Sequence, residues 1–98
     1  MRRVLVVCSG GLGTSVILKV ELKKIFKEWN IPVYIEQSDV SAVGFSNAEM
    51  IIGAKQIISS LPSQQSVALI PLTYIADSAH IRNTLLENDA LREWLDDV

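Results

Sequence analysis

The residues best suited to chemistry form one short run that starts at the single cysteine of the chain. Cys8 is followed by glycines and hydroxyl residues in the order Ser9, Gly10, Gly11, Leu12, Gly13, Thr14 and Ser15. Glycines let a backbone curl until successive N–H groups converge on one point, and hydroxyls add further donors. These donors should lower the pKa of the thiol from its usual value of about 8.5. The run therefore predicts a nucleophilic sulfur inside an anion cradle, which suits covalent phosphoryl or arsenyl chemistry.

Simpler explanations exist for each half of this run. A lone cysteine is often only a small buried side chain, and a glycine-rich turn alone is a weak signal. A cysteine directly before such a turn is a stronger indication of function. Two nucleotide motifs do not fit. Thr14 stands where a nucleotide-binding loop needs its lysine, and Val16 occupies the third glycine position of a dinucleotide fingerprint.

Two predicted elements flank the run and must position it. Val4–Val7 is apolar throughout and too short for a helix, which is typical of a buried parallel strand. A helical pattern follows from about Ser15 to Trp29, where Thr14 or Ser15 can cap the first turn. Its apolar face carries Leu18, Leu22, Ile25 and Trp29, and another face carries Lys19, Lys23 and Lys27. Asn30 and Pro32 end this helix.

The rest of the chain continues the alternation of strands and helices. Further strands are predicted at Val33–Glu36, Met50–Gly53 and Val67–Ile70, the last followed by Pro71. Residues 38–48 are predicted as a loop, Ala54–Leu61 as a short helix and Pro62–Ser66 as a turn. From about Ser78 the chain is predicted helical, with a break at Asn88–Asp89. Ile81 and Leu85 share one face of this stretch, and Leu91, Trp94 and Leu95 share another.

This order of elements predicts an α/β fold. The expected architecture is a four-stranded parallel sheet in the order 2-1-3-4, flanked by helices in the flavodoxin-like winding. Ligands bind such folds beyond the C-terminal ends of the strands, where the winding reverses. The run that follows the first strand lies at that place.

Composition limits the kind of protein. The 98 residues, 49% of them hydrophobic, suffice for one domain over residues 1–98. One cysteine excludes a disulfide scaffold, and no apolar run reaches the roughly 20 residues of a membrane span. The net charge of −2 argues against disorder and non-specific nucleic-acid binding. The net charge is nevertheless uneven, with +4 on residues 1–30 and −6 on the remainder, which indicates a charged partner. We expect a soluble cytoplasmic protein with a free thiol.

These residues carry a family resemblance. The Val-Leu-Val-Val-Cys strand, the Cys-x-Gly-Gly-x-Gly-Thr-Ser loop, the helix from Val16 to Leu22 and the segment from Ala48 to Gly53 are the shared marks. In these the chain resembles the enzyme IIB components of the bacterial sugar phosphotransferase system (PTS), most of all the ascorbate and galactitol type. The resemblance covers almost the whole chain and is most specific over residues 3–30. Beyond residue 60 it is looser, and no site residue is carried over from there.

The resemblance implies a function. Cys8 would be the catalytic residue, taking a phosphoryl group from a phosphohistidine on a IIA partner and holding it as phosphocysteine. The group would then pass to a sugar or sugar acid bound by the membrane transporter IIC. Residues 9–15 match the phosphate loop of the family and carry over as the phosphate-binding residues. No cofactor is implied.

A second family shares the loop geometry. Low-molecular-weight tyrosine phosphatases and related arsenate reductases need an arginine six residues after the cysteine to clamp the phosphate. In this chain Thr14 holds that position. Without a guanidinium, a hydrolytic transition state is stabilised less, which favours a carrier over a hydrolase.

Other residues have ordinary explanations beside a functional one. His80 could relay a phosphoryl group, but is more simply a polar residue early in a helix. Asp77 could be a general acid, but fits a helix cap better. The lysine face could dock an acidic IIA surface or a membrane, or be only solvated. Trp29 and Trp94 are interpreted as packing residues, and no spacing of ligands supports a metal site.

Three hypotheses stay open from the sequence: a phosphoryl carrier of a sugar transport system, a cysteine-dependent phosphatase or arsenate reductase, and a non-enzymatic module that senses phosphorylation state.

Overall fold

The computed structural model describes residues 2–8, 12–39, 48–60, 67–75 and 77–96. The strands are β1 (Arg2–Cys8), β2 (Val33–Asp39), β3 (Met50–Ala54) and β4 (Ala68–Leu72). The helices are α1 (Leu12–Glu28), α2 (Lys55–Ile58), α3 (Ser78–Leu86) and α4 (Asp89–Asp96). None of the helices in these ranges is long and apolar enough to cross a membrane.

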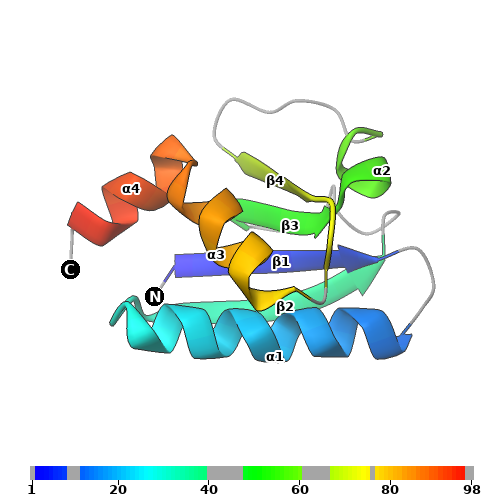
Figure 1. Cartoon of the computed structure of the whole chain (residues 1–98), viewed down its shortest axis with the longest axis horizontal. Helices are drawn as coiled ribbons and strands as arrows, with labels where there is room; N and C mark the ends of the chain where they lie inside the picture. The colour runs from blue at the N-terminus through cyan, green and yellow to red at the C-terminus, as the bar shows by residue number, and fades with distance from the viewer. Residues whose placement is uncertain (1, 9–11, 40–47, 61–66, 76, 97–98) are drawn as a thin grey trace.

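The four strands form one parallel sheet in the order β2-β1-β3-β4 (Figure 1). The predicted architecture and strand order are therefore confirmed. β1 is a central strand with a hydrogen-bonded neighbour on each side, β2 on one edge and β3 on the other. This position explains its composition, because a central strand covered on both faces needs apolar side chains in succession.

Successive side chains of β1 enter two different hydrophobic clusters. Val4 and Val6 belong to the larger cluster, under α1, α3 and α4, whereas Leu5 and Val7 point to the smaller one with Ile51 and Ile58. All four side chains of Val4–Val7 are almost completely buried. The alternation is the period of two that any strand imposes, here with an apolar layer on each side.

The long helix α1 covers the sheet through the face that the sequence predicted. Leu18, Leu22 and Ile25 are fully buried, together with Phe26. Trp29 lies just beyond the helix, half-buried, with its ring edge-on to Phe26 at 6.2 Å between centroids. Both tryptophans are packing residues, since the buried Trp94 also lies against Phe26, at 6.3 Å.

The C-terminal end of α1 is closed by a Schellman motif. Asn30 adopts a left-handed conformation with φ 57, which asparagine tolerates better than most residues. Its N–H donates to Lys27 O at 3.1 Å, and the N–H of Ile31 donates to Phe26 O at 3.0 Å. The predicted end of the helix at Asn30 is confirmed.

An ion pair joins the same end of α1 to α3. The guanidinium of Arg82 donates to the carboxylate of Glu28. This hydrogen bond holds the pKa of the Glu28 carboxyl below its usual value and raises the pKa of Arg82. Both groups face solvent, so the pair orients the helices more than it stabilises the fold.

The predicted break between the last two helices is confirmed. Asn88 caps α4, because its side-chain oxygen accepts from the N–H of Ala90 at 2.9 Å and of Leu91 at 3.3 Å. The buried residues are Ile81 and Leu85 in α3 and Leu91 and Trp94 in α4, with Leu95 packed at the margin.

Several predicted boundaries were wrong. β2 continues to Asp39, so residues 38 and 39 are strand rather than loop. The short helix spans only Lys55–Ile58, since Ala54 still belongs to β3. β4 runs through Pro71 to Leu72, which is possible because β4 is an edge strand and a proline there can turn its missing N–H away from the sheet. Residues 40–47 of the predicted loop, and the turn Pro62–Ser66, lie outside the described residues.

Gly53 allows the sheet to close tightly beside the end of β1. A Cβ at this position would lie 2.7 Å from Val7 Cγ2 and 2.8 Å from Val7 O. We therefore expect Gly53→Ala to overpack the sheet and lower the free energy of unfolding by about 1–3 kcal/mol. Urea unfolding followed by tryptophan fluorescence measures this, with Gln56→Ala on the exposed surface of α2 as the control. Equal stability of the two variants would show that the contact with Val7 does not constrain the sheet.

Candidate functional site

The candidate site begins where β1 ends. Cys8 is the last residue of β1, and α1 begins at Leu12, so only residues 9–11 separate the cysteine from the helix. The sequence placed the helix start near Ser15, and this prediction was wrong by three residues. Thr14 and Ser15 lie in the first turn of the helix rather than at its cap. Glycine near a helix start costs little when the following turns are anchored in the core, as Leu18 and Leu22 are.

The strand end that carries Cys8 is held from both sides. Cys8 is in register with Asp39 of β2, and Val7 is in register with Gly53 of β3. Val6 and Val7 are buried on opposite faces of the sheet. The backbone at Cys8 is thus fixed by a rigid central strand, which is how a reacting atom is kept in place.

The start of α1 supplies the favourable end of a helix dipole. Four of the predicted phosphate-binding residues, Leu12, Gly13, Thr14 and Ser15, form its first turn. The N–H groups of a first turn have no partner within the helix, and that end of the helix attracts anions. No acidic residue occurs in this turn to compete with an anion. Ser9, Gly10 and Gly11 lie outside the described residues, and the roles of residues 8–15 remain predictions.

The two other candidate residues are explained by structure. Asp77 caps α3, since its carboxylate accepts from the N–H of His80 at 3.1 Å. His80 accepts the N–H of Thr73 through Nε2 at 3.0 Å, and its ring lies edge-on to Tyr74 at 5.3 Å between centroids. His80 and Asp77 together fasten the start of α3 to the segment after β4.

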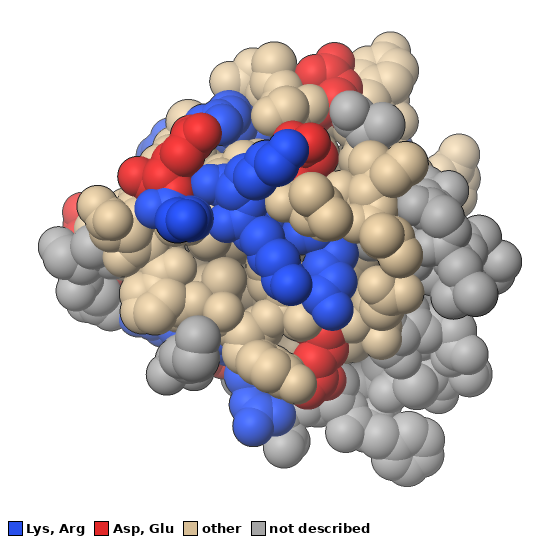
Figure 2. All heavy atoms as spheres, turned by 90° about the horizontal axis from the view of Figure 1, so that it is seen from below, with Lys and Arg blue, Asp and Glu red and all other residues tan. Residues whose placement is uncertain are grey.

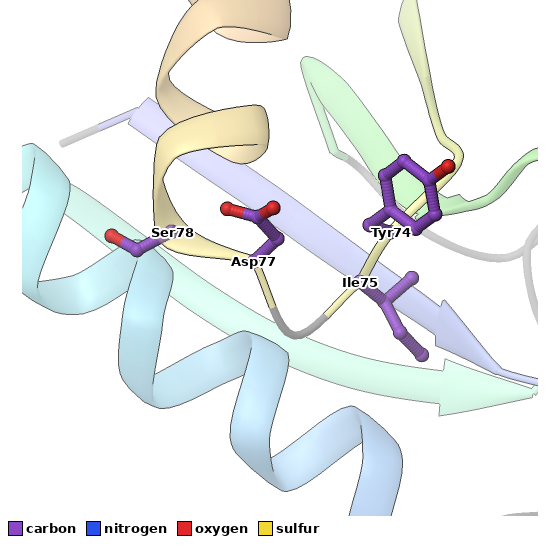
Figure 3. A pocket seen from close by; sticks show the side chains of 4 residues that line it. All are labelled: Tyr74, Ile75, Asp77 and Ser78. Atoms are coloured by element: carbon purple, nitrogen blue, oxygen red, sulfur yellow. The ribbon is translucent and has the colours of Figure 1, made fainter.

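The segment after β4 also lines an open hollow that the sequence did not predict (Figure 3). Its lining residues are Tyr74, Ile75, Asp77 and Ser78. β4 is parallel to β1, so this segment leaves the sheet at the C-terminal ends of the strands, as does the chain after Cys8. The sequence contained one usable signal, because segments after the C-terminal ends of parallel strands commonly line ligand sites.

All four arginines of the chain lie away from the C-terminal ends of the strands, where Cys8 is. Arg2 and Arg3 begin β1, six and five residues before Cys8, a separation of about 17–20 Å along a strand. Arg2 lies over the ring of Trp94 at 4.9 Å and pairs with Glu49 at 3.7 Å, while Arg3 lies over Tyr34 at 5.8 Å.

The other two arginines are engaged on the helices. Arg82 pairs with Glu28 at the far end of α1, and Arg92 donates to Leu86 O at 2.8 Å where α3 meets α4. The fold therefore brings no arginine from elsewhere in the chain to take the position that Thr14 holds in the sequence.

Within the described part of the chain, no group of three or more His, Cys, Asp or Glu side chains could hold a metal ion.

The fold and the site define a class of protein. The structure has the predicted parallel 2-1-3-4 sheet, with a cysteine at the end of a central strand and a long helix after it, although the helix begins three residues earlier than the sequence predicted. The family profile described as PTS system, lactose/cellobiose-specific IIB subunit matches residues 3–87. The chain belongs to this family of IIB subunits, and its role is phosphoryl transfer within a sugar phosphotransferase system. A search of curated proteins found no match.

A variant of His80 tests whether this residue relays a phosphoryl group or only stabilises the fold. We expect His80→Ala to lower the free energy of unfolding by about 1 kcal/mol, because the hydrogen bond to Thr73 N–H is lost. The variant should still accept one phosphoryl group per chain, which intact-protein mass spectrometry measures. Asn83→Ala on the exposed surface of the same helix is the control for stability. A loss of phosphoryl acceptance in a folded His80→Ala would make His80 a participant in the transfer.

Proposed function

We propose that this chain is a cytoplasmic phosphoryl carrier in which Cys8 forms a phosphocysteine intermediate. Residues 1–98 would act as one IIB domain, between a IIA phosphohistidine protein and a membrane IIC transporter that holds the sugar. The observation that carries the proposal is the placement of Cys8 on a rigid strand end beside the start of the 17-residue helix α1. The family match over residues 3–87 supports it independently.

The first transfer can be written atom by atom. The Cys8 thiolate attacks the phosphorus of phosphohistidine, the S–P bond forms as the N–P bond breaks, and the histidine nitrogen of the donor takes up a proton. Residues 9–15 would hold the phosphoryl oxygens through their N–H groups and hydroxyls. In the second transfer a sugar hydroxyl attacks the phosphorus, the S–P bond breaks, and the thiolate is restored as the hydroxyl proton is released.

The distribution of arginines favours a carrier over a phosphatase. A hydrolase with this loop would need a guanidinium on the equatorial oxygens during attack by water. Arg2, Arg3, Arg82 and Arg92 all have contacts elsewhere in the fold, and position 14 is a threonine. A phosphocysteine formed here should therefore persist until a sugar hydroxyl arrives.

The substrate we propose is a sugar or sugar acid of the ascorbate or galactitol type. The motifs over residues 3–30 support this choice, whereas the matching family is described as lactose/cellobiose-specific. Phosphorylation assays that pair the chain with IIC membranes of each type separate these substrates. Product formed only with a lactose or cellobiose transporter would overturn the ascorbate or galactitol proposal.

The decisive experiment is intact-protein mass spectrometry at neutral pH. The protein is incubated with phosphoenolpyruvate, the general phosphotransferase proteins and a IIA protein, beside Cys8→Ser. We expect the wild type to gain the mass of one phosphoryl group. We expect Cys8→Ser to relay no phosphoryl group to sugar, because a hydroxyl is far less ionised than a thiol and its phosphate ester is less labile. Sugar phosphorylation by Cys8→Ser would exclude Cys8 as the carrier. Turnover of a small phosphoester or of arsenate by the wild type would instead favour the phosphatase or reductase.

The proposed phosphate loop has its own test in Gly13, which lies in the first turn of α1. A side chain at this position should obstruct the approach of phosphoryl oxygens to the backbone. We expect Gly13→Val to slow phosphoryl acceptance by about 10-fold or more, the effect of losing a charged hydrogen bond. Rates come from quenched time points read by mass spectrometry, and thermal unfolding verifies that the variant is folded. Acceptance at the wild-type rate would show that the backbone around Gly13 does not hold phosphate.

A further inference from the structure

The exposed face of α1 is divided into an apolar half and a basic half. Val16, Ile17 and Val20 are 48%, 50% and 45% exposed, and all three lie in the first half of the helix. Lys23, Lys24 and Lys27 are exposed in the second half. Figure 2 views the molecule from the side of α1 and shows basic side chains gathered in the middle of this face. We call these six residues the α1 face.

The apolar half is not a random scatter of exposed side chains. Positions 16, 17 and 20 are within one turn of one another on the helix surface, opposite the buried Leu18, Leu22 and Ile25. The other large exposed hydrophobic residues, Tyr34, Tyr74 and Leu86, lie singly on separate elements among the described residues. Grouped exposed apolar side chains rimmed by polar ones mark interaction sites, whereas single ones need no explanation.

The position of this group relates it to Cys8. Val16 and Val20 follow Leu12 by four and eight residues, which is about 6–12 Å along the helix from its start. A protein that delivers a phosphoryl group must bring it to the end of β1. A standard interface covers about 800 Å² on each partner, a disc of roughly 16 Å radius. An interface of that radius at Cys8 extends toward the start of α1, which is the end of the helix that carries the apolar half of the α1 face.

Charge indicates what kind of partner fits. The four lysines of α1 (Lys19, Lys23, Lys24 and Lys27) outnumber its two glutamates (Glu21 and Glu28), so the helix carries +2, whereas residues 31–98 carry −6. A phosphorylated donor brings about −1.5 to −2 on the phosphoryl group alone. Complementary charge would steer such a donor toward α1 and orient it. A lipid surface fits less well, because Lys24 pairs with Glu21 at 3.8 Å and the apolar half carries no aromatic side chain.

We infer that the α1 face is the docking surface for the phosphohistidine donor, with the apolar half forming the contact and the basic half attracting an acidic surface. This inference rests on the proposed function of Cys8. Beyond that function, the inference names the surface of the chain that the donor recognises. It also gives the chemistry of the matching donor surface, which is apolar with an acidic margin.

The apolar half is tested without changing charge. We expect Ile17→Gln with Val20→Gln to reduce the rate of transfer from a phosphorylated IIA protein at low donor concentration by about 10-fold or more, because apolar contact is lost. The rate at saturating donor should remain within about two-fold, since the site itself is intact. Alkylation of Cys8 by iodoacetamide should keep its wild-type rate. Leu86→Gln, an exposed apolar side chain on α3, is the matched control and should transfer like the wild type.

The basic half is tested by reversing one charge. We expect Lys23→Glu to slow transfer by about 10-fold at low ionic strength and by less as salt rises, because the steering field is screened. Arg92→Glu changes the net charge by the same amount on α4 and should have little effect. An unchanged salt dependence in Lys23→Glu would overturn the electrostatic part of the inference.

The outcomes separate the docking surface from the function. A wild type that accepts no phosphoryl group from any IIA protein would contradict the proposed function itself. Normal transfer to the wild type and equal transfer to the Gln variant would leave the function standing and overturn the docking surface. Transfer that is slowed equally at saturating donor would also overturn it. Binding of the wild type, but not the Gln variant, to phosphatidylserine-rich vesicles, with normal transfer in both, would assign the face to a membrane instead.

Discussion

The packing of β1 is the constraint on which the rest of the structure depends. It is hydrogen-bonded along both edges, and alternate side chains of Val4–Val7 enter the two hydrophobic clusters. Both edges of β1 are hydrogen-bonded and both of its faces are buried. A shift of register by one residue would therefore move the side chains of each hydrophobic cluster to the wrong face of the sheet. The last residue of β1 is Cys8, so the same burial that stabilises the sheet also fixes where the sulfur-bearing residue lies. The close approach of Gly53 to Val7 tightens the sheet at this end.

The helix α1 then contributes a different property from each of its parts. Its inner face closes the core over the sheet, and the Schellman motif at Asn30 sets where the helix stops and the chain turns into β2. Its first turn begins four residues after Cys8, and the N–H groups of a first turn have no partner within the helix. Its outer face is left to solvent. The geometry that anchors the helix therefore leaves its outer face, with the exposed Val16, Ile17 and Val20, available for other contacts.

Local sequence patterns predicted the elements well, and non-local packing explains where they failed. The strand order followed from alternating elements, and the break at Asn88 followed from its capping chemistry. Pro71 was predicted to lie beyond a strand, because proline usually ends one; the predicted strand order had already placed the fourth strand at the edge, where a proline is tolerated. The early start of α1 at Leu12 was missed, since glycine and hydroxyl residues resemble a loop until the core that anchors the helix is known. The hollow beside Tyr74 forms where the chain passes from β4 into α3, and its lining residues show no pattern in the sequence that predicts it.

The arginines show how a fold can limit chemistry by placing residues away from a site. Arg2 and Arg3 sit over aromatic rings at the start of β1, and Arg82 and Arg92 join helices. Each therefore has a structural contact that moving to the far end of β1 would break. A thiophosphate held by backbone donors without a guanidinium is bound but not activated toward water. Binding without activation is what a carrier requires, because the phosphoryl group must survive the interval between the departure of the donor and the arrival of the acceptor.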